Sequence, residues 1–379
     1  MTPLHSFPLP PPAVVGQPLA SVDTPALLLD LDAFERNLDR MQAAADVAGI
    51  ALRPHGKAHK TPAIAHAQIA RGAVGICCQK VSEAIAFAAA GIGDIHISNE
   101  LASAFKAALA ADLAGRVRLS VCVDDSAQVA AIGKAASRAG TTVGLLVDID
   151  IGQGRCGVAD ADAVRRLLDA AAHHPGLDFR GLQAYQGSVQ HIRGHAARQE
   201  EAQRAADRAG TIRRALEQAG IRCATVTGGG SGSAEFDLQS GVYTELQVGS
   251  YACMDRDYAD NESGATLPFE HALFLAATVM STASGRHAVV DAGLKSLAVD
   301  SGLPTVWPQD AGLVYRQASD EHGIVEPAAG AASVPALGTL LRLVPGHCDP
   351  TFNLHDTLVC FRGDTVADLW PIAARGMSR

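Results

Sequence analysis

The chain has 379 residues, 48% of them hydrophobic and 19% charged, which is enough for more than one buried core. Its 31 Lys and Arg against 40 Asp and Glu give a net charge of −9, and the basic residues are scattered, which argues against a nucleic-acid-binding protein. No apolar run approaches the ~20 residues of a membrane helix, and the Pro-rich start differs from a secretory signal, so we expect a cytoplasmic protein with no membrane partner.

After a Pro-rich arm (residues 1–22), short apolar runs alternate with amphipathic stretches rich in Ala, Leu, Arg and Glu. This alternation predicts strands and helices in turn, and therefore a parallel sheet. Nine runs have the character of strands: 26–31, 50–55, 73–78, 94–98, 117–123, 143–150, 179–186, 224–230 and 243–249. A (β/α)₈ barrel needs only eight. We therefore predict a TIM-type (β/α)₈ barrel within residues 23–268 and assign the first strand, 26–31, to another sheet.

Beyond about Pro268 the helical stretches disappear and short β-rich runs follow one another to the end of the chain. Runs of this kind are typical of an antiparallel sheet. We predict a mainly antiparallel β domain over residues 269–379, which also takes in strand 26–31.

The exit of the second barrel strand is unusually basic, and it reads RPHGKAHK over residues 53–60. Reactive groups of a parallel barrel lie at the carboxyl ends of its strands. Alternation along an extended segment would place Arg53, His55 and Lys57 on one face. Neighbouring cations in a dry barrel mouth would disfavour the ammonium form of Lys57 and make it a nucleophile for carbonyls. The alternative is a solvated basic loop.

Three later strand exits are rich in glycine and polar residues: DIDIGQGRCGV (148–158), LQAYQGSVQH (182–191) and TVTGGGSGS (225–233). Arg155 among glycines could approach a planar ring or an anion, although an ordinary surface turn is the alternative. The consecutive glycines could offer backbone N–H groups to a phosphate. They form neither a P-loop nor a dinucleotide fingerprint, because the GK[ST] ending and the acidic partner strand are missing.

The C-terminal region contains one compact set of metal-ligand types, His347-Cys348-Asp349. Residues two apart in an extended segment share a face, so His347 and Asp349 could hold one divalent cation while Cys348 points away. One imidazole and one carboxylate suit Mn²⁺ or Mg²⁺ better than a closed zinc site. The alternative is a turn with a hydrogen-bonded His.

Taken in order, several segments resemble those of the bacterial D-threonine aldolases, which belong with D-serine dehydratases and alanine racemase among the fold-type III pyridoxal 5′-phosphate enzymes. The resemblance runs from about Asp23 to the C-terminus. The segments that carry it are DTPALLLDLDAFERNL, RPHGKAHKTP, GICCQKVSEA, DIHISNE, VDIDIGQGRCGV, AYQGSVQH, TGGGSGS, VDAGLKS and HCDPTFNLHD.

The resemblance implies a barrel that holds pyridoxal 5′-phosphate, a C-terminal β domain and a homodimer. Lys57 matches the family's Schiff-base lysine, Arg155 the residue that faces the pyridine nitrogen, and Tyr185 the tyrosine beside the cofactor. The phosphate cradle is matched by Thr227, Gly229, Gly230, Ser250 and Tyr251, and the metal ligands by His347 and Asp349. Dehydratase relatives carry Cys where this chain has Asp349, which favours the aldolase branch.

The implied activity is the metal-dependent cleavage of D-threonine and related D-3-hydroxy amino acids to glycine and an aldehyde. A divalent ion, with Mn²⁺ favoured over Mg²⁺, would acidify the β-hydroxyl, and a metal-bound hydroxide, His59 or His191 would remove its proton. The alternative is a dehydratase acting on D-serine or D-threo-3-hydroxyaspartate. A cofactor-binding barrel without activity and an interaction scaffold are readings from other classes.

Overall fold

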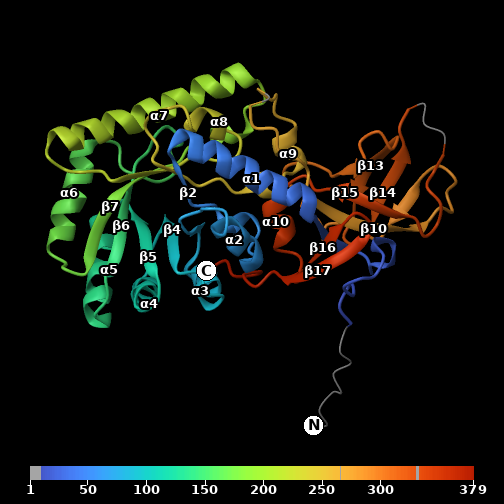
Figure 1. Cartoon of the computed structure of the whole chain (residues 1–379), viewed down its shortest axis with the longest axis horizontal. Helices are drawn as coiled ribbons and strands as arrows, with labels where there is room; N and C mark the ends of the chain where they lie inside the picture. Colours follow the sequence, from blue (N-terminus) through green and yellow to red (C-terminus); the bar gives the residue numbers. More distant parts are fainter. Residues whose placement is uncertain (1–9, 265, 330–332) are drawn as a thin grey trace, which may run out of the picture.

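The computed structural model describes residues 10–264, 266–329 and 333–379. Residues 1–9 of the predicted Pro-rich arm therefore lie outside the described residues. Two sheets dominate the structure, one of eight strands and one of nine (Figure 1). No helix within the described ranges has both the length and the apolar character needed to cross a membrane.

The eight-stranded sheet is parallel throughout, in the order β2-β9-β8-β7-β6-β5-β4-β3. Its ends meet, because Val74 N donates to Leu52 O and Cys77 N to Pro54 O, each at 2.8 Å, so the sheet curls into a barrel. The predicted barrel is confirmed. Its strands are β2 (Ala51–Leu52), β3 (Ile76–Cys78), β4 (Asp94–Glu100), β5 (Arg118–Val123), β6 (Val143–Asp148), β7 (Leu177–Ala184), β8 (Thr225–Gly228) and β9 (Glu245–Leu246).

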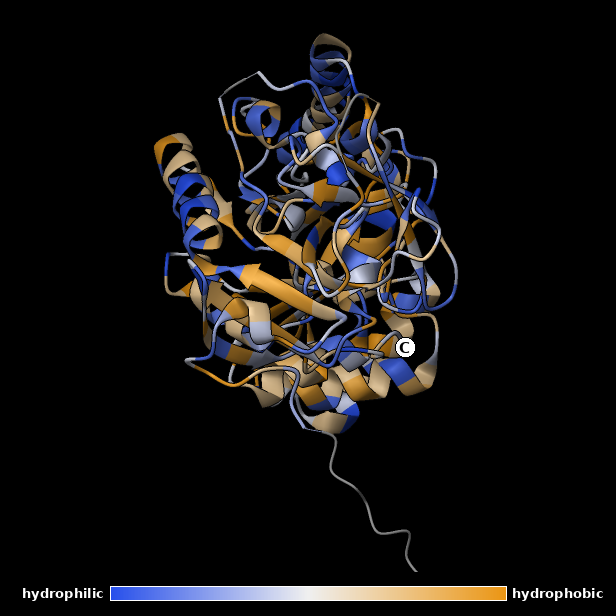
Figure 2. Cartoon of the chain, turned by 90° about the vertical axis from the view of Figure 1, so that its right-hand side faces the viewer, coloured by the Kyte–Doolittle hydropathy of each residue, from blue (hydrophilic) through white to orange (hydrophobic). Residues whose placement is uncertain are grey.

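Helices between the strands cover the outside of the barrel (Figure 1). In α1, Asp30 accepts hydrogen bonds from Asp32 N and Ala33 N at the start, and Gly49 ends the helix at a φ of 68°. Figure 2 shows both hydrophilic and hydrophobic residues on the helices, as expected for helices with one buried face. The longer helices are α1 (Leu31–Ala48), α2 (Pro62–Ile69), α3 (Val81–Ala89), α4 (Ala104–Ala114), α5 (Ser126–Ala139), α6 (Ala161–Ala172) and α7 (His195–Gln218).

The nine-stranded sheet is mainly antiparallel and has its own apolar core. The first strand of the chain lies in this sheet, between β10 and β16. This is the sheet to which the sequence analysis assigned it, because the barrel had one strand candidate too many. The short strand β12 was not predicted. The strands are β1 (Ala26–Asp30), β10 (Leu273–Ser281), β11 (Ala288–Val290), β12 (Thr305–Trp307), β13 (Leu313–Ala318), β14 (Gly323–Pro327), β15 (Leu340–Val344), β16 (Thr357–Arg362) and β17 (Thr365–Pro371). The exact domain limits at residues 22 and 268 stay a prediction.

Two segments of the second region reach back to the barrel (Figure 1). The short helix α10 (Cys348–Phe352) lies against the 3₁₀ turn η2 (Gly56–Ala58), which follows the second barrel strand. The C-terminus lies beside α3, where Ser82 Oγ donates to Arg379 O at 2.6 Å. The exit of β2 is therefore covered by chain that is almost 300 residues away in sequence, since Lys57 and Asp349 are 292 residues apart.

Candidate active site

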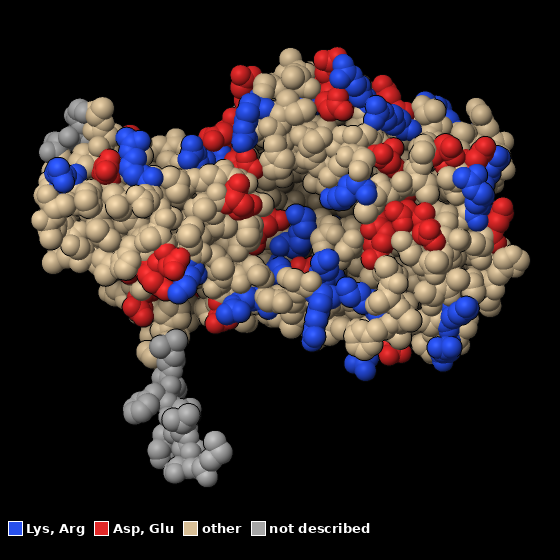
Figure 3. All heavy atoms as spheres, turned by 180° about the vertical axis from the view of Figure 1, so that it is seen from behind, with Lys and Arg blue, Asp and Glu red and all other residues tan. Residues whose placement is uncertain are grey.

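A cavity lies at the carboxyl ends of the barrel strands. Figure 3 shows a hollow near the middle of the rear face, with Lys and Arg side chains inside and around it. Six residues predicted as site residues line the cavity: Lys57, Arg155, Tyr185, Gly229, Gly230 and Ser250. It is also lined by His55, Ala58, Gln79, Ser98, Gln183, Ser231, Gln247, Gly249 and Tyr258. The loops that were far apart in sequence are thus gathered in one place.

Lys57 lies in η2 and points at a carboxylate of the second region. Its Nζ is 2.6 Å from Asp349 Oδ2, and its backbone N donates to His55 Nδ1 at 3.4 Å. The expectation that neighbouring cations disfavour its ammonium form is wrong, because the negative charge of Asp349 raises the pKa of Lys57. The extended segment also ends at His55, so Arg53 and Lys57 do not share a face: Arg53 forms ion pairs inside the barrel with Glu245 and Asp94.

His55 forms the support beneath Lys57. Its Nε2 lies 3.1 Å from Gln79 Nε2 and 3.2 Å from Ser98 Oγ. Burial lowers the pKa of His55 well below its usual value, and the Lys57 charge adds to this effect, so the ring is neutral. Gln79 and Ser98 were not predicted as site residues. Gln79 directly follows β3 and Ser98 lies in the carboxyl-terminal half of β4, so the rule that reactive groups lie at the carboxyl ends of barrel strands would have found them.

Arg155 and Tyr185 face each other at the cavity wall. The guanidinium carbon of Arg155 lies 5.6 Å from the Tyr185 ring centroid. The glycine-rich loop that carries Arg155 is held where Gly157 N donates to Asp124 Oδ2 at 3.0 Å. Burial raises the pKa of Tyr185, so its hydroxyl stays protonated. A positive charge and a hydrogen-bonding hydroxyl therefore line the same wall.

The glycines after β8 form a tight backbone wall. Gly229 has a φ of +69°, and a Cβ on it would lie 2.5 Å from Asp237 Oδ2. A Cβ on Gly230 would lie 2.5 Å from Gln190 Oε1. Neither position accepts a side chain, so the backbone itself faces the cavity. The wall is thus free of side chains, and Gly230 N donates to Ser233 Oγ at 3.3 Å.

The side chains of two residues predicted for the phosphate cradle do not line the cavity. Thr227 is fully buried inside the barrel, where its Oγ1 donates to Glu245 Oε1 at 2.9 Å, and it is absent from the cavity lining. The Tyr251 side chain is also buried, and its hydroxyl accepts from Gln68 Nε2 at 3.2 Å. Only the backbone of Tyr251 approaches the cavity, where its N donates to Ser231 Oγ at 2.9 Å.

His347 and Asp349 lie together, although not in the extended segment that was expected. A helix begins at Cys348, with His347 as its N-cap residue at φ −145° and ψ 125°. His347 Nε2 lies 4.0 Å from Asp349 Oδ1, while the Cys348 side chain is fully buried. Burial opposes ionisation of Asp349, but the charges of Lys57 and His347 outweigh it and lower the pKa of the carboxyl. A carboxylate and an imidazole therefore face the same point beside Lys57.

The two predicted base candidates have opposite environments. His59 is 1% exposed, and its Nδ1 accepts from Thr61 N at 3.1 Å, which leaves the proton on Nε2. Burial lowers the pKa of His59 to about 4. His191 is exposed, and its Nδ1 lies 2.8 Å from Asp257 Oδ2. Because a carboxylate only accepts, Nδ1 carries a proton, and in the neutral ring the lone pair is on Nε2.

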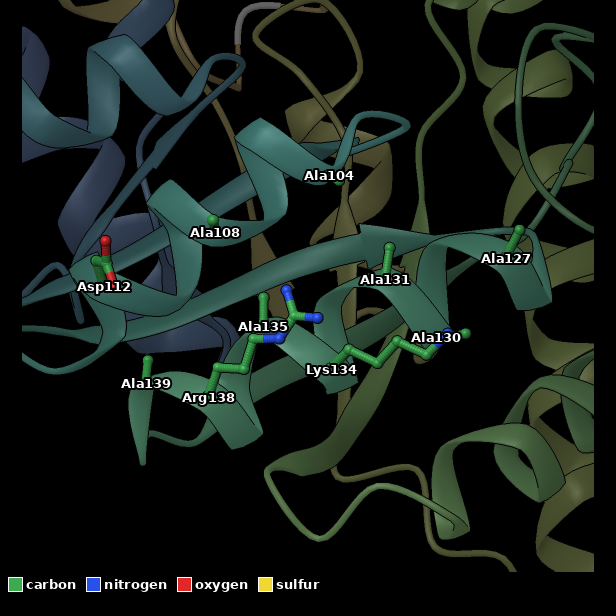
Figure 4. Close-up of a pocket in the computed structure, with 10 residues that line it drawn as sticks. All are labelled: Ala104, Ala108, Asp112, Ala127, Ala130, Ala131, Lys134, Ala135, Arg138 and Ala139. Carbon is green, nitrogen blue, oxygen red and sulfur yellow. The ribbon is translucent and has the colours of Figure 1, made fainter.

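A larger hollow of about 550 Å³ lies away from this chemistry, between α4 and α5 on the outside of the barrel (Figure 4). Alanines make up most of its wall. Its charged side chains are Asp112, Lys134 and Arg138. They lie along the wall without converging on a point, so this hollow is not a candidate active site.

Comparisons with known proteins agree with this arrangement. Residues 29–257 match the family described as alanine racemase, N-terminal domain, and residues 272–361 match the putative serine dehydratase domain. The chain is 53% identical to a D-threonine aldolase of Arthrobacter sp., over 99% of both chains. It is 45% identical to a 3-hydroxy-D-aspartate aldolase of Paracoccus denitrificans, over 96% of this chain and 95% of that protein.

Among solved structures, the crystal structure of D-threonine aldolase from Filomicrobium marinum superposes with a TM-score of 0.94. The two chains are 49% identical, and the match covers 98% of this chain and 100% of the other. Both sheets and their connection are thus shared with that structure.

Proposed function

The chain belongs to the D-threonine aldolase family of carbon–carbon lyases, and from this we propose that it cleaves D-threonine and related D-3-hydroxy amino acids to glycine and an aldehyde, using pyridoxal 5′-phosphate and a divalent metal ion. The observation that carries the proposal is the contact between Lys57 Nζ and Asp349 Oδ2 at 2.6 Å. It brings an amine of the barrel and a metal-ligand type of the second region to one point.

The residues of the cavity fit pyridoxal 5′-phosphate. Lys57 presents the amine that would hold its aldehyde carbon, and Arg155 presents a charge to the ring nitrogen. The side-chain-free wall at Gly229 and Gly230, with Ser250 beside it, suits the phosphate. When bound, the cofactor supplies a conjugated ring that accepts electron density from the substrate Cα.

His347 and Asp349 fit a divalent ion. Their facing atoms, Nε2 and Oδ1, are 4.0 Å apart, and metal–ligand bonds of ~2.0–2.2 Å allow one ion to contact both. An imidazole and a single carboxylate favour Mn²⁺, with Mg²⁺ or another divalent ion as the alternative. Such an ion supplies Lewis acidity at the substrate hydroxyl.

His191 is the better placed base of the two predicted histidines. Asp257 holds its Nδ1 and leaves Nε2 free to accept a proton, and its ring lies 6.0 Å from that of the cavity residue Tyr258. His59 is the poorer candidate, because it is buried and its lowered pKa opposes proton uptake. We therefore assign the removal of the β-hydroxyl proton to His191.

The direct test incubates the purified protein with D- or L-threonine, pyridoxal phosphate and Mn²⁺, and assays acetaldehyde and glycine. We expect both products from the D isomer alone. Replacing His191 with Asn should lower kcat by ~10²-fold or more. His59→Gln should lower kcat less than this. Equal loss in both variants would overturn the assignment of the base.

The dehydratase is the second candidate, because residues 272–361 match the putative serine dehydratase domain. Ammonia and a 2-oxo acid from D-serine or D-threo-3-hydroxyaspartate, without aldehyde, would replace the aldolase proposal by this one. Asp349 in place of the Cys of dehydratase relatives favours the aldolase.

We also propose a homodimer in the cytoplasm, and sedimentation of the purified protein tests its mass.

A further inference from the structure

The second region contains an acidic residue that contacts the proposed metal ligand from behind. Asp300 lies in the connection between β11 and β12, and its Oδ2 is 2.7 Å from His347 Nδ1. Half of the Asp300 side chain is exposed, at 54%, whereas that of His347 is 25% exposed. The imidazole is thus held between two carboxylates, with Asp300 on one nitrogen and Asp349 facing the other.

This contact determines which nitrogen of His347 is free. A carboxylate only accepts hydrogen bonds, so Nδ1 must carry the proton that it shares with Asp300. In the neutral ring Nε2 then keeps its lone pair, and Nε2 is the atom that lies 4.0 Å from Asp349 Oδ1. A metal ion is bound by the unprotonated nitrogen, and the partner of the other nitrogen fixes this choice.

The peptide group that joins His347 to Cys348 is fixed by other contacts. Its carbonyl accepts from Thr351 Oγ1 at 2.7 Å, and the next residue, Cys348, donates its N to the buried Asp255 Oδ2 at 2.8 Å. The remaining freedom is rotation of the ring, which has two broad and nearly equivalent orientations. A single hydrogen bond to Nδ1 is enough to select one of them.

The loop that carries Asp300 is attached to the same helix. The Oγ1 of Thr351, which is fully buried, also accepts from Ala298 N at 3.2 Å. Asp300 is therefore two residues from a fixed point on α10, and His347 is the N-cap residue of that helix. The donor and the acceptor of the contact are thus both tied to α10.

We propose that Asp300 is a positioning residue of the metal site: it holds the Nδ1–H tautomer and the orientation of His347, so that Nε2 faces a divalent ion shared with Asp349. The inference rests on the proposed function, since it requires His347 to bind the ion. Asp300 itself does not touch the ion or the substrate. Its negative charge also increases the basicity of the imidazole.

The test measures Mn²⁺ affinity without turnover. The full chain with pyridoxal phosphate is freed of metal by chelation and titrated with Mn²⁺, and free Mn²⁺ is followed by its electron paramagnetic resonance signal. Asp300→Ala should weaken binding by ~10- to 100-fold. Asp300→Asn keeps an acceptor oxygen but loses the charge, so we expect a smaller loss. The visible absorption of the bound cofactor should stay unchanged in both variants.

Asp310→Ala is the matched control, because it removes the same charge from an exposed position. It should bind Mn²⁺ as the wild type does. In a His347→Ala background, Asp300→Ala should change the affinity by less than ~2-fold, because its only route to the ion is gone.

The outcomes separate the inference from the function on which it rests. Wild-type affinity in both Asp300 variants, together with weakened binding in His347→Ala, would overturn the role of Asp300 and leave the metal site standing. Wild-type affinity in His347→Ala would overturn the metal site itself. An equal loss of Mn²⁺ affinity in Asp300→Ala and Asp310→Ala would mean that removing any negative surface charge weakens binding. That result would also overturn the inference.

Discussion

The two walls of the cavity are built differently. On the barrel wall, the backbone N of Lys57 donates to the neutral, buried His55, whose other ring nitrogen contacts Gln79 and Ser98. On the opposite side, the His347 ring is supported by Asp300, a half-exposed residue of a loop. Buried hydrogen bonds are costly to break, whereas exposed ion pairs contribute little. The comparison indicates a rigid wall around Lys57, where we propose that the cofactor binds, and a more accessible wall at His347, where we propose that the metal ion binds.

The rigid wall extends downward into the barrel. Gln183 and Gln247, which line the cavity, hydrogen bond each other at 2.7 Å. Gln183 also contacts His96 at 3.2 Å, and Gln247 donates to Thr227 at 3.0 Å. These hydrogen bonds join residues of β4, β7, β8 and the exit of β9 in one polar network below the cavity floor, and every partner is a buried group.

The largest effect should come from Lys57. We expect Lys57→Ala to lower turnover by at least ~10³-fold, or about 4 kcal/mol, because the chain loses the amine proposed to hold the cofactor. The visible absorption of protein-bound pyridoxal phosphate should disappear as well. Lys134→Ala, an exposed lysine of α5, is the control and should remain coloured and active. A yellow, active Lys57→Ala protein would refute the cofactor assignment.

Asp349→Ala tests the side of the site formed by His347 and Asp349, and its effects should differ from those of Lys57→Ala. Turnover should fall by ~10²-fold and its dependence on added Mn²⁺ should weaken, since one carboxylate ligand is missing. The cofactor absorption should persist, because Lys57 stays in place. The control is Asp356→Ala, whose side chain is 82% exposed and pairs with Arg375 at the surface. Full activity of the wild type after chelation would contradict the metal role.

The sequence predicted the barrel wall better than the opposite one, for a physical reason. Strand periodicity and glycine clusters are local signals, so they located Lys57, Arg155 and the glycines at 229 and 230 at strand exits. The contact between Lys57 and Asp349 joins residues 292 apart, and no local pattern encodes it. The sign of the pKa shift of Lys57 depends on that contact, so it was predicted wrongly.

The helix at Cys348 was missed although a signal existed. Asp349 and Pro350 fall in the first turn of α10, and acidic residues and proline are typical of helix N-termini. The apolar run before them suggested a continuing strand instead. Thr227 and Tyr251 were assigned to the cradle from the family resemblance, and their side chains are buried, so only their backbone groups could serve it, which stays a prediction.

The last prediction concerns acid stability, and it should test the barrel wall alone. His59 and His96 are buried and neutral, and burial lowers their pKa values to about 4 and about 3. The unfolded chain binds these protons near pH 6.5. The native state does not, so stability is complete above pH 6.5 and falls as the pH drops toward 4, by about 1.4 kcal/mol per pH unit for each group.

His96→Gln isolates one of these protons. The His96 ring contacts Ser120 and Gln183, far from the second sheet, and Gln can replace part of this bonding. Urea unfolding at pH 7, 6, 5 and 4.5 should give a free energy of unfolding that falls less steeply with acid in the variant than in the wild type. The exposed His322→Gln should keep the wild-type slope. An unchanged slope in His96→Gln would mean that the native barrel accepts this proton, and the wall beneath the cofactor would then be wetter and less rigid than its buried hydrogen bonds indicate.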